Sequence, residues 1–397
     1  MRPGWLDRLR RGSLLATVLL YSAGYGVWGL LLLLVTTIIE AGITRRLPWT
    51  RNRLDLFLAA FLGAFLISGL FSPYRPLAVG LIGLGSLTIY LAFGATATMV
   101  TRDPSFLRPL AIAWVAGALG AGLWGVMLHR TTGQPAFTPV LGQNALGTTL
   151  LIATILALGL VLELRGRRRY LAAATGIALL TGLVLTYTRG AWLGALVGGA
   201  LVLGLSGVRR LVVGIMAVTL IVVLSLAIFG SERGALISRA ASIADLSANK
   251  ARLYIIRASL AIFITHPLSG TGLGTFSLAY PAFRLPDDPN TLPMPFAHNI
   301  FANMAAEGGV VGFTTFGAIV VAGILGGWRW YHAVRREPQH TTAAVYLSTF
   351  IGAIVHQLFD GTLLSIHLGL GMWMLLAVLG VGWTRVSGPP QGRWTSV

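Results

Sequence analysis

Repeated apolar runs of roughly 20 residues constrain the fold of this chain more than any other feature. A run of that length crosses the hydrocarbon core of a bilayer as an α-helix, because about 20 residues rising 1.5 Å each cover about 30 Å. Only 11% of the 397 residues are charged, whereas a soluble protein of this size carries about 25%. Short loops rich in arginine separate the runs. The sequence therefore predicts an all-α integral membrane protein.

The first apolar run is too long for one membrane span. It covers residues 14–43, and as a single helix it would measure about 45 Å. Gly24 and Gly26 interrupt it near the middle, so we predict two helices joined by a tight turn. With that division the chain has about 12 spans, and the others are expected at 54–72, 77–100, 107–128, 146–164, 170–187, 189–207, 211–229, 308–328, 342–359 and 363–383.

The distribution of arginine favours this count. With 12 spans and the N-terminus in the cytoplasm, most of the 30 Lys and Arg residues fall on the cytoplasmic side, as the positive-inside rule requires. The short outer loops then hold Arg75, Arg130 and Arg189. We expect both termini in the cytoplasm. The net charge of +18 is explained by topology, so nucleic acid is not an expected partner and membrane lipids are.

The same threading divides the chain into four parts. Residues 1–229 hold spans 1–9, residues 230–297 form one large outer, periplasmic loop, residues 298–384 hold spans 10–12, and residues 385–397 are a cytoplasmic tail. Apolar residues at helical spacing predict an amphipathic helix from about 249 to 265 in the loop, lying at the membrane surface. The Pro-rich stretch 281–295 is a candidate lid.

Arg189 lies at the outer end of a span, where the positive-inside rule disfavours a basic residue. One interpretation is an arginine that extends its charge to the interface. The other is a guanidinium that grips a diphosphate with two hydrogen bonds. In the loop helix, Arg252 and Arg257 are separated by about 140° around the axis, so only one of them is expected to face a ligand. Periodicity does not choose between them.

His298 ends the loop and precedes the next span. It is either an interfacial histidine or a general base, since its side chain titrates near neutral pH. Asn299 and Glu307 follow it, and Glu307 and Asp360 are the acids associated with spans on the outer side. His356 precedes Asp360 by four residues, which allows a pair on one helix face with either a structural or a catalytic role.

Other classes of site find little support. The segment Gly-Thr-Gly-Leu-Gly at 270–274 is a poor nucleotide loop, because no strand is predicted before it and its third glycine is misplaced. The glycines elsewhere are expected at close helix contacts. Cysteine is absent, and no His, Asp and Glu cluster has the spacing of metal ligands. We expect no metal and no cofactor.

Three segments together resemble the O-antigen ligase and O-antigen polymerase superfamily. They are a Thr-Arg-Gly segment at 188–190, an arginine at 252 followed by His-Pro-Leu-Ser-Gly-Thr-Gly at 266–272, and a His-Asn pair at 298–299. The resemblance covers roughly residues 140–380. It implies an inner-membrane glycosyltransferase in which Arg189 and Arg252 hold the diphosphate of an undecaprenyl-linked glycan. His298 would assist transfer to an acceptor hydroxyl, without metal and with inversion at the sugar.

The resemblance specifies the reaction class and leaves the acceptor open. A ligase of lipopolysaccharide biosynthesis would use lipid A–core or a related glycolipid, a polymerase would use another glycan chain, and a third enzyme would use a protein hydroxyl. A lipid or polysaccharide transporter without chemistry is the alternative from another class, although no internal repeat supports it. A membrane scaffold would leave the outer arginines and His298 unexplained.

Overall fold

The computed structural model describes residues 4–207, 234, 250–290, 294–364 and 366–387. Within these residues the regular structure is helical and contains no strand, which confirms the predicted fold class. The longer helices are α1 (Gly4–Ser22), α2 (Gly26–Thr44), α3 (Asp55–Phe71), α4 (Arg75–Ile89), α5 (Ala95–Arg102), α6 (Leu107–Thr132), α7 (Gln143–Glu163), α8 (Arg167–Leu185), α9 (Arg189–Leu205), α12 (Lys250–Thr265), α13 (Phe276–Phe283), α14 (Ile300–Ala333), α15 (His340–Gln357) and α16 (Ile366–Ser387). Shorter turns are a π-helical one at Tyr90–Gly94, which joins α4 to α5, and 3-10 turns at Pro104–Phe106 and Thr362–Leu364.

Seven helices in the described part of the chain are long and apolar enough to cross a membrane. They are Gly26–Thr44, Arg75–Arg102, Pro104–Thr132, Gln143–Glu163, Arg167–Leu185, Ile300–Ala333 and Gly369–Ser387. The other predicted spans coincide with α1, α3, α9 and α15, except for the one expected at 211–229, which lies outside the described residues. The total of 12 spans therefore stays a prediction.

The first apolar run is divided at the expected position. Gly24 adopts a left-handed backbone (φ 99°), which a residue with a side chain rarely adopts, and α2 starts two residues later. The two helices then pack together closely, and the Thr17 hydroxyl of α1 donates to the Gly29 carbonyl of α2 at 2.9 Å. A buried ion pair between Arg10 and Glu40 joins them near their other ends.

Small residues allow α9 and α15 to pack closely against each other. A methyl group added to Gly194 on α9 would lie 2.5 Å from the carbonyl oxygen of Gly352 on α15. One added to Gly198 would lie 2.9 Å from the Ser348 carbonyl oxygen. The interface between α9 and α15 therefore requires glycine, as expected for membrane helices that pack backbone to backbone.

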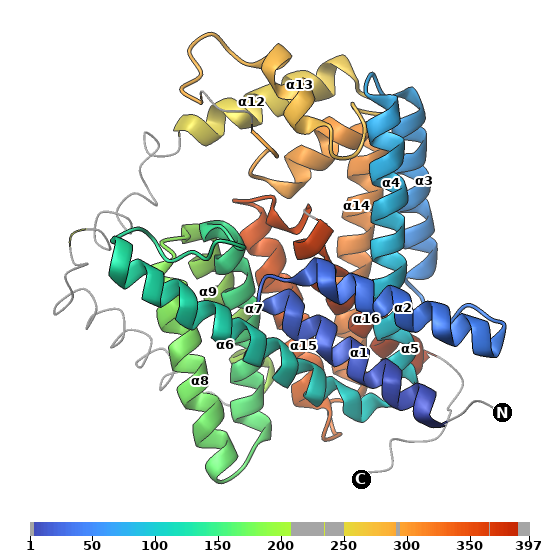
Figure 1. Cartoon of the computed structure of the whole chain (residues 1–397), viewed down its shortest axis with the longest axis vertical. Helices are drawn as coiled ribbons and strands as arrows, with labels where there is room; N and C mark the ends of the chain where they lie inside the picture. Colours follow the sequence, from blue (N-terminus) through green and yellow to red (C-terminus); the bar gives the residue numbers. More distant parts are fainter. Residues whose placement is uncertain (1–3, 208–233, 235–249, 291–293, 365, 388–397) are drawn as a thin grey trace.

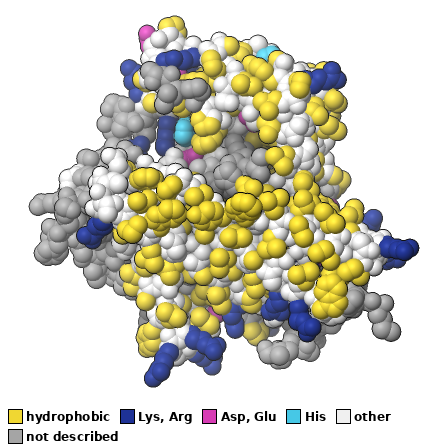
Figure 2. Space-filling model, viewed as in Figure 1, with side chains coloured by type: hydrophobic (Ala, Val, Ile, Leu, Met, Phe, Trp, Pro, Cys, Tyr) yellow, Lys and Arg dark blue, Asp and Glu magenta, His cyan; other side chains and the backbone are white. Residues whose placement is uncertain are grey.

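Helices α3, α4 and α14 rise side by side toward α12 and α13, which form a small layer at the upper end of the molecule (Figure 1). That layer has its own apolar core, formed by Ile255, Ala258, Ile262, Phe276, Ala279, Tyr280, Ala297 and Ala306. Figure 2 shows an apolar lateral surface, with Lys and Arg side chains at its lower edge around the α7–α8 connection. A helix is present where one was predicted at about 249–265, as α12, while its place in an outer loop at the membrane surface stays a prediction.

Candidate active site

His298 lies in the turn that leads into α14. Its backbone is left-handed (φ 51°), an uncommon conformation for a residue with a side chain and one that is often found at functional sites. Asn299 holds the turn: its side-chain oxygen accepts from the amides of Phe301 and Ala302, both at 3.0 Å. The His298 ring packs edge-on against Phe296, with 4.9 Å between ring centroids.

Asp360 faces the histidine from the other side of the site. His298 Nδ1 lies 3.9 Å from Asp360 Oδ1, which is too far for a direct hydrogen bond but close enough for an ion pair when the imidazole is protonated. Asp360 Oδ1 accepts from the Gly361 amide at 2.7 Å. Asn299 Nδ2 donates to the Leu358 carbonyl at 3.0 Å and so ties the start of α14 to the segment after α15.

Burial sets the ionisation of this pair. Burial, and after it the positive charge of Arg252, lowers the pKa of His298 to about 4. Burial raises the pKa of Asp360 to about 6, opposed by the Gly361 amide and by Arg252. At neutral pH the imidazole is therefore uncharged and able to accept a proton, while the carboxylate beside it is ionised.

Arg252 is the arginine of the loop helix that faces the site. It is half-buried and acts electrostatically on His298, His356 and Asp360. Arg257 is exposed, and its guanidinium lies 5.9 Å from the centre of the Tyr254 ring. The structure thus resolves the ambiguity that the helical spacing left open.

Arg189 is the first residue of α9 and is half-buried. The next residue, Gly190, packs against the end of α15: a methyl group added to it would lie 2.9 Å from His356 Nδ1 and 2.8 Å from Phe359 Cβ. Trp192 closes the hairpin by donating from Nε1 to the Leu183 carbonyl at 3.0 Å. Arg189 therefore starts its helix beside the α15 end that leads to Asp360.

Asn144, at the start of α7, connects Asp360 to the hairpin that carries Arg189. It was not identified from the sequence. Its side chain faces Asp360, and its Oδ1 accepts from the Thr188 hydroxyl at 3.4 Å, next to Arg189 in the chain. The available signal was a polar Gln-Asn pair at 143–144 that opens an apolar span on the predicted outer side. Phe296, which packs on His298, carried no such signal.

His356 and Asp360 do not form the pair that their spacing allows, because α15 ends at Gln357, before Asp360. His356 Nε2 instead contacts the Thr148 hydroxyl at 2.9 Å, and Thr148 lies 2.8 Å from the Thr362 hydroxyl. All of these side chains are buried. His356 therefore links α15 to α7 as a buried structural residue and is not paired with Asp360.

The glycine segment 270–274 is not a phosphate-binding loop. Gly270, Gly272 and Gly274 have left-handed backbones, and the segment packs against α14. Glu307 belongs to the same contact, since its Oε1 accepts from the Phe276 amide at 2.9 Å. In the part of the chain that the structure describes, no group of three or more His, Asp or Glu residues is arranged to hold a metal ion.

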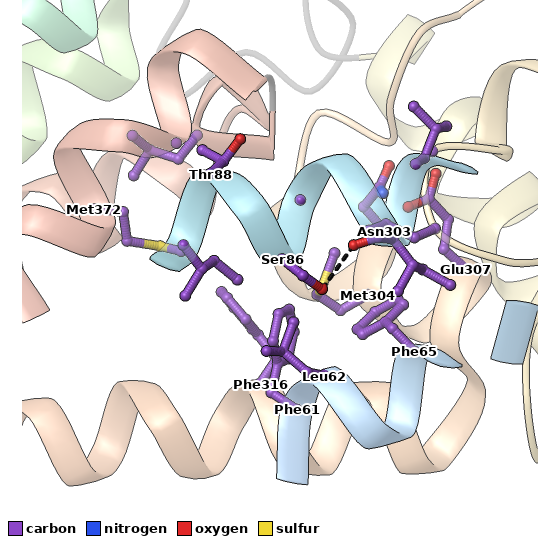
Figure 3. Close-up of a pocket in the computed structure, with 18 of the residues that line it drawn as sticks. Phe61, Leu62, Phe65, Ser86, Thr88, Asn303, Met304, Glu307, Phe316 and Met372 are labelled. Carbon is purple, nitrogen blue, oxygen red and sulfur yellow. Dashed lines mark hydrogen bonds between the residues drawn. The ribbon is translucent and has the colours of Figure 1, made fainter. Parts of the chain in front are cut away.

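A cavity of about 310 Å³ lies behind Phe296, between α3, α4, α14 and α16. Its wall is mainly apolar, with Phe61, Phe65 and Phe316 at one side and Asn303 and Glu307 at the other (Figure 3). A space with this mainly apolar lining suits a hydrocarbon chain, because Ser86, Thr88, Asn303 and Glu307 are its few polar side chains.

Comparison with known families supports a relationship over the part of the chain that holds most of these groups. No curated protein matches the chain. Residues 174–317 match the model of the O-antigen ligase family, a range that contains Arg189, Arg252, His298 and Glu307. His356 and Asp360 lie beyond it. Over residues 174–317 the match supports the O-antigen ligase superfamily, membrane glycosyltransferases of the ligase and polymerase type.

Proposed function

We propose that the protein transfers a glycan from a polyprenyl diphosphate, undecaprenyl diphosphate in a bacterial inner membrane, to an acceptor hydroxyl. The observation that carries this proposal is a largely buried histidine whose Nδ1 lies 3.9 Å from the Asp360 carboxylate and whose pKa is lowered by burial and by the nearby charge of Arg252. His298 Nδ1 faces Asp360, which leaves Nε2 for the acceptor. Arg252, and Arg189 from the hairpin, supply the positive charge that a diphosphate leaving group needs.

The reaction is a single displacement at the anomeric carbon. His298 Nε2 takes the proton of the acceptor hydroxyl, and the acceptor oxygen attacks the anomeric carbon. The bond from that carbon to the diphosphate oxygen breaks, and its electron pair stays on the diphosphate, whose charge the arginines stabilise. Attack from the face opposite the leaving group inverts the sugar. The proton on His298 then passes to solvent, and Asp360 stabilises the imidazolium while it exists.

The hydrocarbon chain of a lipid substrate is expected in the apolar cavity behind Phe296. The cavity is connected to the site by Phe296, whose ring lines the cavity and also packs edge-on against His298. A polyprenyl or acyl chain placed there would put a polar head group near His298. Among acceptors we favour lipid A–core or a related glycolipid, the ligase reaction.

Paired arginine variants test the donor site. Arg252→Ala is expected to weaken binding of a polyprenyl-diphosphate glycan by roughly 30-fold or more, since a charge-assisted contact to a charged group contributes about 2–3 kcal/mol. Arg257→Ala, from the same helix, is the matched control and should bind the donor like the wild type. Arg189→Ala and His298→Ala should each abolish transfer in protein that folds normally. Equal loss in both α12 variants would contradict the assignment.

A break in α14 gives the transporter alternative a specific observation to rest on. Gly309 has non-helical backbone angles (φ 60°, ψ −159°) within the helix, and discontinuous helices are common at transporter substrate sites. Here, however, the break is occupied by residues of the 266–275 segment. A labelled lipid-linked glycan that crosses a reconstituted bilayer without a product of changed mass would favour transport.

A further inference from the structure

The break in α14 at Gly309 leaves backbone amide and carbonyl groups that need hydrogen-bond partners from another part of the protein. Backbone amides and carbonyls that lose their helical partners inside a membrane protein are costly unless another part of the protein replaces them. At Gly309 the helical pattern stops and resumes at once. The carbonyls of Ala306 and Glu307 and the amide of Val310 therefore need other partners.

The segment that follows α12 supplies those partners. The amides of Thr271 and Gly272 donate to the carbonyls of Ala306 and Glu307 at 3.1 and 2.8 Å. In return the Val310 amide donates to the Pro267 carbonyl at 2.8 Å. Loop and helix are thus bonded on both sides of the break.

The contact is too close for a side chain at either glycine. A methyl group added to Gly309 would lie 2.4 Å from the carbonyl carbon of Leu268. One added to Gly270 would lie 2.3 Å from the carbonyl carbon of Glu307. We refer to the bonded segment, residues 266–276 against residues 306–310, as the α14 clamp.

Glu307 adds a side-chain bond to the clamp. Its Oε1 accepts from the Phe276 amide at 2.9 Å, and the amides of Gly274 and Thr275 face the same carboxylate. Thr275, the residue at the cap position of α13, makes no side-chain cap of its own. A carboxylate at a helix N-terminus is favourable because it meets unpaired amides and the positive end of the helix dipole. Glu307 is 2% exposed.

The clamp joins the two elements that carry the proposed catalytic groups. Arg252 is on α12, which runs directly into the clamp at His266, and His298 immediately precedes α14. The α3 helix anchors the same region, since the Ser68 hydroxyl donates to the Glu307 carbonyl at 2.8 Å and Ser72 donates to the Thr271 carbonyl. Movement of α12 relative to α14 therefore requires this contact to open.

We infer that Glu307 is a positioning residue that, through the α14 clamp, fixes Arg252 on α12 relative to His298 at the start of α14. The inference rests on the proposed function for its catalytic consequence, while its geometric part stands alone. It also explains Gly270 of the His-Pro-Leu-Ser-Gly-Thr-Gly segment at 266–272, where a side chain would meet the backbone of Glu307 and Gly308 at the break.

Distance measurements test the geometric part. The chain has no cysteine, so spin labels can be placed at two cysteines introduced at exposed positions, Leu260→Cys on α12 and Val321→Cys on α14. We expect one narrow distance distribution in the labelled parent. Glu307→Gln keeps the side-chain volume but turns an amide donor toward backbone amides, and it should broaden the distribution. Glu163→Gln, at the end of α7, is the matched control and should leave it unchanged.

Kinetics test the catalytic part. Glu307→Gln should raise the KM for a polyprenyl-diphosphate glycan by about tenfold or more, and the acid limb of its pH profile should move toward higher pH as Arg252 moves away from His298. If Glu307 only stabilised the fold, the variant would contain less folded protein. The apparent kcat would then fall in proportion, and KM and the pH profile would stay unchanged.

Two results overturn the inference. One is a parent-like distance distribution in Glu307→Gln, and the other is a lower kcat with unchanged KM and pH profile. If the wild type itself transfers no glycan, the proposed function fails, and the distance distributions still decide whether Glu307 positions α12.

Discussion

Replacement of Asp360 by asparagine is the perturbation whose effect the structure predicts in most detail. The change keeps the volume of the side chain and an oxygen that accepts from the Gly361 amide, as Asp360 Oδ1 does at 2.7 Å. What it removes is the negative charge 3.9 Å from His298 Nδ1. The variant therefore isolates the electrostatic contribution of the carboxylate to the positive imidazole formed during transfer.

The magnitude follows from the distance. With an effective dielectric constant of about 20 to 40, two unit charges at this separation attract each other by about 2–4 kcal/mol. The imidazole is neutral before the reaction and positive after it accepts the proton, so this attraction appears as the transition state forms. Since each 1.36 kcal/mol is tenfold in rate, kcat should fall by roughly 30- to 1,000-fold.

The assay separates turnover from binding. Transfer from a defined polyprenyl-diphosphate glycan is followed by mass under saturating donor and acceptor, and donor binding is measured separately. Donor affinity in Asp360→Asn should stay within about threefold of the wild type, because the arginines are intact. Asp287→Asn, at an exposed acid between α13 and α14, is the control and should turn over normally. A normal kcat in Asp360→Asn, or lost donor binding with normal kcat, would refute the reasoning.

Two further predictions concern acid and the clamp. The His298–Asp360 pair should take up protons in two macroscopic steps, near the pKa of about 6 and then near about 4. As pH falls, transfer should drop in two stages, first as the carboxylate is neutralised and then as the base is protonated; a single step near 6.5 would contradict both pKa shifts. Separately, Gly309→Ala should lower the thermal unfolding midpoint in detergent by several degrees, since its φ of 60° and the Leu268 backbone leave no room for a methyl group. Gly317→Ala on the same helix, with open space around it, should not; equal midpoints in the two variants would show that the clamp is not rigid.

The fold was largely predictable, because membrane helices are read from composition. The division of the first run at Gly24 and the helix at Lys250–Thr265 both follow from local signals, a glycine interruption and a helical apolar pattern. The number of spans is untested. Whether a segment crosses the bilayer depends on neighbouring helices as well as on its own hydropathy.

The site was predictable only as a set of candidates. Helical spacing separates Arg252 from Arg257 but does not say which face of α12 meets the rest of the protein. The spacing of His356 and Asp360 suggested a pair, whereas α15 ends between them and Asp360 turns to His298. The role of the 266–272 segment was out of reach, because its partner is a helix break at residue 309 with no local signature beyond a pair of glycines.

Glycan transfer can be tested with reconstituted protein that is supplied with one defined polyprenyl-diphosphate glycan. A lipid A–core acceptor, a glycan acceptor and a hydroxyl-bearing peptide are offered in separate reactions, and the products are measured by mass. We expect one acceptor whose mass increases by that of the glycan, with an equal amount of free polyprenyl diphosphate, and no product with His298→Gln. Donor that stays intact with every acceptor, or full activity in His298→Gln, would contradict the proposed function.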